Sequence, residues 1–367
     1  MTLTQTDPDT RDDAGTVARR VLAVGPLSVI LRPRIVIAGV VGVALAFLLF
    51  LLSVGISDYP MTPIDVLRIL LGGGTRIENV VVFDVSLPRA LVSVLVGFAL
   101  GLAGSLTQLI ARNPLATPDV LGITSGASAA AVAAIAFAGS WGAWLADLGI
   151  PSAALIGGLG TAVAMYLLAW SRHSITGIDP LRLVLIGVGL TWALQALTSF
   201  MLTRAQIVDV SRAQVWLVGS VSQATWSNVW PVTIGVAVGV VMVIAMNRQI
   251  GAMQLTNDVA RGLGIRTDLV SRLLLITAVV VAALAVAASG PISFVALLAP
   301  QISMRLGRTP VPTPLLSGTV GAILVVGGDL LCRTVIPGSL PVGIVTAGVG
   351  GPFLIYLMIS MSRKADA

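Results

Sequence analysis

The sequence predicts an all-α integral membrane protein with about ten transmembrane helices. Hydrophobic residues make up 56% of the 367 positions and charged residues only 10%, and the mean hydropathy is +0.98. These values lie far from those of soluble globular domains. The 39 glycines and 19 prolines would weaken soluble helices, but membrane helices use small residues for close packing and tolerate proline.

Ten runs are apolar enough for a membrane crossing, which needs roughly 20 residues. They lie at about 35–55, 90–111, 120–142, 150–171, 182–203, 228–247, 271–289, 292–305, 313–332 and 342–361. The division between the seventh and eighth runs rests only on Ser289-Gly290-Pro291, and a single helix there would give nine spans. A shorter apolar stretch, 213–227, predicts a re-entrant or interfacial helix at the outer face.

The distribution of positive charge predicts the orientation. With ten spans, 16 of the 22 Lys and Arg residues lie on the side of the termini and six on the other. The positive-inside rule then places both termini in the cytoplasm and the chain in the cell membrane. Residues 1–34 are expected to form a disordered cytoplasmic tail, because the first 20 contain four Asp and no apolar core. The six outer residues are Arg68, Arg76, Arg89, Arg204, Arg212 and Arg333.

Several kinds of site are excluded because lysine, cysteine and histidine each occur only once in the sequence. Lys364 is the only lysine, so the phosphate-binding loop of an ATPase cannot be built. Cys332 and His173 are the only cysteine and histidine, which leaves neither a disulfide nor a cysteine-based metal site. We therefore expect no catalytic residue, cofactor or metal. The basic residues do not cluster beside aromatic ones, so no nucleic-acid partner is expected.

Polar residues within the predicted spans are few. Asp329 is the only acid among them, and an i,i+4 ion pair with Arg333 is favoured over a proton relay. Gln195, Thr198 and Ser199 of the fifth span are candidates for lining an aqueous pathway, although they could equally hydrogen-bond across helices.

The longest predicted cytoplasmic loop, 248–270, has the features of a short helix. Thr256 can cap it, Asp258 lies in its first turn, and Gly264 can adopt the left-handed conformation that ends it. Most other loops are far shorter. A helix that docks on a partner protein is therefore favoured over a simple connection.

Three stretches carry a resemblance to a known family. They are LPRALVSVLVGFALGLAGSLTQLIARNPLATPDVLGITSGAS (87–128), LTNDVARGLGI (255–265) and SGPISFVALLAPQISMRLG (289–307), the last continuing through GDLLCRTVIPGSLPVGIVTAGVGGPF (328–353). The chain resembles, from about 35 to 362, the FecCD/BtuC family of ABC-transporter permeases, which import ferric siderophores, haem or cobalamin.

The resemblance implies a type II ABC importer permease (BtuC-like) fold of ten helices, forming the permease domain 35–362. It implies a dimer with an identical or related permease subunit, two cytoplasmic ATPase subunits, and an extracytoplasmic binding protein that delivers a metal chelate. Ferric siderophores are favoured over cobalamin and haem because siderophore systems form the largest branch. A stand-alone secondary transporter is the alternative from another class, disfavoured by the scarcity of acids within the spans.

The resemblance also assigns roles to residues. The family's ATPase-coupling loop falls on 255–265, and Arg89 and Arg333 match arginines that pair with acids of the binding protein. The chain departs from the family pattern at Ser86, where an arginine is usual and Arg76 could substitute, and at Gln301, where a histidine is common. Thr256 stands where the family has glycine. The residues expected at the ATPase contact are Thr256, Asp258, Ala260, Arg261, Leu263 and Gly264.

Overall fold

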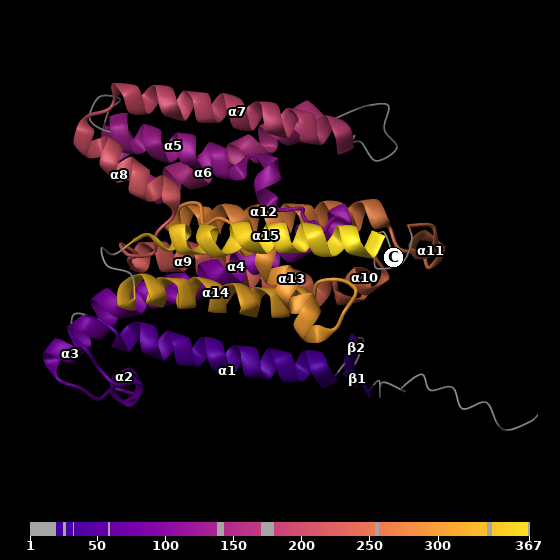
Figure 1. Cartoon of the computed structure of the whole chain (residues 1–367), viewed down its shortest axis with the longest axis horizontal. Coiled ribbons are helices and arrows are strands. Elements are labelled where there is room, and N and C mark those ends of the chain that lie inside the picture. The colour runs from indigo at the N-terminus through magenta and orange to yellow at the C-terminus, as the bar shows by residue number, and fades with distance from the viewer. Residues whose placement is uncertain are drawn as a thin grey trace, which may run out of the picture.

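The computed structural model describes residues 20–24, 27–31, 33–57, 59–137, 143–169, 180–253, 257–335 and 340–365. Its long helices run side by side in roughly one direction (Figure 1). The elements are β1 (Arg20–Val24), β2 (Leu27–Leu31), α1 (Pro33–Gly55), α2 (Pro63–Leu70), α3 (Arg76–Val80), the π-helix η1 (Val81–Ser86), α4 (Leu87–Ala111), the 3-10 helix η2 (Pro118–Leu121), α5 (Ile123–Phe137), α6 (Ala143–Ala169), α7 (Pro180–Arg204), α8 (Ile207–Val218), α9 (Trp226–Ala245), α10 (Asn247–Ala252), α11 (Asn257–Gly262), α12 (Thr267–Ser289), α13 (Val295–Gly307), α14 (Pro314–Thr334) and α15 (Val342–Ala365).

The bundle has two distinct ends. The two strands, α10, α11 and the C-terminus lie at one end, called here the ribbon end (Figure 1). Helices α2 and α3 lie at the opposite end, called here the α2–α3 end. The helices run between these ends, so polar groups at the two ends of one helix belong to different faces of the molecule.

Within the described ranges, eight helices are long and apolar enough to cross a membrane. The expected all-helical membrane class agrees with this finding, but the expected count of ten is not confirmed. Two of the predicted spans, 120–142 and 292–305, correspond to α5 and α13, which have only 15 and 13 residues. Both are shorter than the roughly 20 residues of a full crossing.

The boundary expected at Ser289-Gly290-Pro291 is confirmed. Helix α12 ends at Ser289, and Gly290 has a φ of 71°. Helix α13 begins at Val295, directly after Phe294, which has a φ of 65°. Two left-handed residues so close together cannot continue a helix, so α12 and α13 are separate elements.

Two expectations about local structure were wrong in their bounds. The predicted interfacial helix at 213–227 is instead α8, which begins at Ile207 and ends before Gly219, where φ is 84°. The tail expected to be disordered through 34 contains the antiparallel pair β1–β2, with Val21 opposite Ile30. Apolar and β-branched residues on either side of Gly25-Pro26 explain this ribbon. Residues 1–19 lie outside the described residues.

Helix α4 occupies the centre of the bundle, and glycines bring its backbone into direct contact with that of α14. A methyl group placed on Gly97 would overlap the carbonyl oxygen of Gly321, and one on Gly321 would overlap the carbonyl oxygen of Gly97. One turn further along α4, a methyl group on Gly101 would overlap the carbonyl oxygen of Ser317 in the same way. Small residues that allow such backbone contact are the usual basis of helix association in membranes.

This contact predicts an asymmetric effect of two similar substitutions on α14. Gly321→Ala should destabilise the protein by about 1–3 kcal/mol, because the added methyl forces α4 and α14 apart. Gly327→Ala is the control, since nothing lies within 4 Å of the position of its methyl group, and it should stabilise the helix by up to roughly 1 kcal/mol. Thermal unfolding of both purified variants measures the difference, and equal melting temperatures would contradict the proposed contact.

Candidate functional site

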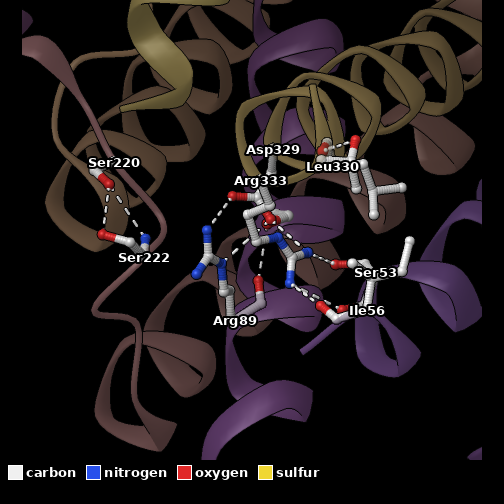
Figure 2. Close-up of polar contacts among 10 residues, drawn as sticks. Ser53, Ile56, Arg89, Ser220, Ser222, Asp329, Leu330 and Arg333 are labelled. Carbon is white, nitrogen blue, oxygen red and sulfur yellow. Dashed lines mark hydrogen bonds and ion pairs between the residues drawn. The ribbon is translucent and has the colours of Figure 1, made fainter. Parts of the chain in front are cut away.

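An ion cluster at the α2–α3 end joins α4 and α14. Asp329 and Arg333 are one turn apart on α14, and Arg89 lies in the first turn of α4. The guanidinium of Arg89 donates to both carboxylate oxygens of Asp329, from Nε to Oδ2 at 3.2 Å and from Nη2 to Oδ1 at 2.7 Å. Nη2 of Arg333 lies 2.8 Å from Oδ2. The expected Asp329–Arg333 pair is confirmed, and Figure 2 shows that Arg89 shares it.

Arg333 extends the cluster to α1. Its Nη1 donates to the carbonyl oxygens of Ser53, at 3.2 Å, and Ile56, at 2.8 Å, and its Nη2 donates to the Ser53 hydroxyl at 2.6 Å. The carbonyls at the C-terminal end of a helix lack partners within it and carry partial negative charge. Arg333 therefore binds the end of α1 while it pairs with Asp329, and three helices are joined at one point (Figure 2).

The cluster is largely covered, and it carries a net positive charge. The side chain of Asp329 is 3% exposed, that of Arg333 is 15% exposed and that of Arg89 is 23% exposed. Two guanidinium groups share one carboxylate, so one positive charge remains uncompensated within the cluster. Arg89 is the more accessible of the two arginines predicted to dock a partner protein.

The positions around Ser86 differ in their accessibility. Ser86 is 4% exposed at the end of η1, so a partner protein cannot reach it. Arg76 begins α3 and is exposed. Of these two residues, only Arg76 is placed where it could meet a partner.

At the ribbon end, α11 closes with the geometry expected at Gly264. The φ of Gly264 is 79°. Its N–H donates to the carbonyl oxygen of Arg261 at 2.9 Å, and the N–H of Ile265 donates to that of Ala260 at 3.1 Å. These two bonds form a Schellman motif, which requires a left-handed residue and therefore favours glycine. The predicted left-handed Gly264 is confirmed.

The other residues of the predicted coupling loop have different surroundings. The α11 segment projects from the ribbon end (Figure 1). Leu263 is 65% exposed there, whereas Ala260 is buried. Nη2 of Arg261 lies 3.5 Å from the Asp268 carboxylate, and both side chains are about half exposed. Thr256 and the side chain of Asp258 lie outside the described residues. Leu263 and Arg261 are thus accessible, while Ala260 packs within the chain.

Gln301 connects two elements at the ribbon end. Its Nε2 donates to Oε1 of Gln108 on α4 at 2.7 Å and to the carbonyl oxygen of Pro114 at 3.3 Å. The Gln108 amide in turn donates to the carbonyl oxygen of Leu297 at 3.3 Å. Gln301 therefore holds the turn after α4 against α13. This role of Gln301 was not predicted from the sequence, because only a departure from the family pattern marked the position.

The three pathway candidates on α7 do not behave alike. Gln195 and Ser199, four residues apart, are exposed, and the spacing places them on one face of the helix. Thr198 is buried, and its hydroxyl donates to the carbonyl oxygen of Leu194 at 2.8 Å. Gln195 and Ser199 are therefore the accessible members. In the described part of the chain, no group of three or more His, Cys, Asp or Glu could hold a metal ion.

Comparison with known proteins matches the chain to one family. The profile of the FecCD transport family matches residues 43–360. The chain is 33% identical to the iron(3+)-hydroxamate import system permease protein FhuG of Bacillus subtilis (strain 168), over 89% of this chain and 97% of that protein. It is 38% identical to the achromobactin transport system permease protein CbrC of Dickeya dadantii (strain 3937), over 86% and 90%.

A solved structure supports the fold. A chain of a metal-chelate type ABC transporter in an inward-facing conformation superposes with a TM-score of 0.74 and is 24% identical. The match covers 88% of this chain and 98% of that one. The helical arrangement described above is therefore that of a known transporter fold.

The ion cluster predicts a large effect of Asp329→Asn on stability. The variant keeps the shape of the side chain but leaves two largely covered arginines without their carboxylate, and removing one partner of a buried ion pair destabilises by about 3–5 kcal/mol. The partial exposure of Arg89 reduces this figure toward its lower end. Asp209→Asn on α8 makes the same charge change in the first turn of a helix and should lower stability by about 1 kcal/mol at most. Thermal unfolding compares the two, and equal melting temperatures would show that the cluster does not hold α1, α4 and α14 together.

Proposed function

The chain belongs to the FecCD transport family, and from this premise we propose that it is the transmembrane permease subunit of an ABC importer for ferric siderophores. The observation that carries the proposal is its identity of 33% and 38%, over nearly their whole lengths, to permeases named for iron(3+)-hydroxamate and achromobactin. Cobalamin and haem are the other cargo classes. The relatives are permeases and not enzymes, and ATP hydrolysis belongs to separate subunits because Lys364 is the only lysine.

The ion cluster argues against a stand-alone secondary transporter. Acidic residues within the spans are the usual mark of proton- or ion-coupled carriers. Asp329, the only acid in the predicted spans, is held by Arg89 and Arg333. The carboxylate therefore has a structural role, in joining α4 to α14. Energy must then enter from outside the membrane domain.

The ribbon end is the proposed cytoplasmic face. It holds the two strands, α11 and the C-terminus (Figure 1). The positive-inside rule supports this orientation, since 16 of the 22 Lys and Arg residues belong to segments that the sequence predicts on the side of the termini. The α2–α3 end would then face the binding protein. There the positively charged cluster, with its accessible Arg89, supplies a surface for an acidic side chain of that protein. Arg333 would support this surface through its contacts with Asp329 and α1.

The α11 segment is the proposed contact with an ATPase subunit, and each permease subunit of the dimer would bind one of the two ATPase subunits in this way. The exposed Leu263 offers an apolar contact and Arg261 a charged one, while the buried Ala260 and the left-handed Gly264 fix the position of the helix. Asp258 and Thr256 complete the predicted set. A second permease subunit, identical or related, would face the exposed side of α7, where Gln195 and Ser199 line a passage wide enough for a metal chelate.

Uptake in cells tests the cargo class. A strain that lacks only this chain should lose uptake of one radiolabelled ferric siderophore and regain it when the chain is supplied on a plasmid. Ferric hydroxamate, ferric achromobactin, haem and cobalamin are compared in parallel. Loss of haem or cobalamin uptake with all ferric siderophores unaffected would replace the proposed cargo by one of the alternatives.

A substitution at Gly264 tests the coupling role. Gly264→Val places a β-branched residue at a φ of 79°, which costs about 1 kcal/mol or more and should displace α11 while the spans stay folded. ATPase activity of the complex should lose its stimulation by the loaded binding protein, and uptake should fall with it. Gly262→Val is the matched control, because Gly262 is helical and nothing lies within 4 Å of its methyl position. Full stimulation in Gly264→Val would mean that the loop only connects two helices.

A further inference from the structure

A groove on the surface of the bundle lies between α6 and α12. It has a volume of about 370 Å³, and its lining is apolar except at one end. The wall from α6 extends from Leu159 to Tyr166, which corresponds to roughly 10 Å along a helix axis. The wall from α12 includes Leu275, Ile276 and Val279. None of the functional roles proposed above uses this groove.

The polar end of the groove is formed by Arg272. This arginine is exposed, and its Nε donates to the carbonyl oxygen of Asp268 at 3.2 Å. It is the sixth residue of α12, which begins at the ribbon end. Tyr166 lies opposite, in the last turns of α6. An arginine and a tyrosine near the ends of two membrane helices belong to the headgroup layer of a bilayer.

A second hollow adjoins the first and shares Arg272 with it. Its volume is about 520 Å³, and its charged lining consists of Arg266, Arg272 and Asp268 together with Arg261, which the proposed ATPase contact also uses. Three arginines and one aspartate leave a net charge of +2. The apolar groove therefore ends at this second hollow, which is positively charged and is called here the basin.

We propose that this combined site binds an anionic phospholipid from the leaflet that meets the ribbon end, with an acyl chain along the α6–α12 groove and the phosphate at Arg272. The occupant must be apolar over most of its length and anionic at one end. A soluble phosphate would use the basin but not the groove, and a neutral lipid would use the groove but not the basin. Basic pockets between membrane helices recognise acidic headgroups in this way.

Lipid retention on the full-length permease, purified with its partner subunits, tests the proposal. The complex is extracted from bilayers of phosphatidylcholine and phosphatidylglycerol, and the lipids that remain bound are counted by native mass spectrometry. Phosphatidylglycerol should be enriched on the wild type. Arg272→Gln should reduce its retention about fivefold, the factor expected for one arginine near an anionic surface, and Arg272→Lys should preserve most of it. Arg248→Gln on the exposed side of α10 is the charge control.

The groove is tested by a second matched pair. Val163→Phe, at a lining position that is 58% exposed, should lower retention of both lipids, whereas Val241→Phe, 62% exposed on α9, should not. Unchanged phosphatidylglycerol retention in Arg272→Gln or in Val163→Phe would overturn the proposal. So would displacement of the bound lipid by soluble glycerol phosphate, which would identify the basin as a site for a free anion.

Discussion

The backbone contact between α4 and α14 is the constraint on which the rest of the structure depends. In a bilayer the hydrophobic effect does not drive helices together, so close packing between small residues has to do so. Gly97 and Gly321 allow this approach, and it places α4 at the centre of the bundle. The polar ends of α4 are then fixed: Arg89 meets Asp329 at one end, and Gln108 meets Gln301 at the other.

This arrangement connects the two faces of the molecule. The ion cluster joins α1, α4 and α14 at the end proposed to meet the binding protein. The Gln108–Gln301 link holds the turn after α4, and Nη2 of Arg112 at the end of α4 donates to the carbonyl oxygen of Met253 at 3.4 Å, just before the α11 segment. A displacement of α4 would therefore reach both the outer cluster and the proposed ATPase contact. The carboxylate of Asp329 and both terminal nitrogens of the Arg333 guanidinium have partners, whereas the buried Nε of Arg333 has none. The buried network is therefore largely but not fully satisfied.

Local patterns in the sequence predicted part of this structure. Periodicity and composition predicted the membrane class, the i,i+4 spacing predicted the Asp329–Arg333 pair, and the glycine pattern predicted the end of α11 at Gly264. The Arg89–Asp329 contact could not be predicted in this way, because it joins residues 240 positions apart. The predicted 292–305 run already had about the length of α13, whereas the short length of α5 was missed, since apolar residues continue past its end and hydropathy does not mark where a helix ends.

The central claim is that this chain moves its cargo only when an ATPase supplies the energy. The most direct measurement is uptake of a radiolabelled ferric siderophore into liposomes that contain the purified chain, with or without its ATPase subunits, ATP and loaded binding protein. Uptake should require all three additions and should not respond to an imposed proton gradient. Uptake by the chain alone, driven by a proton gradient, would contradict the claim.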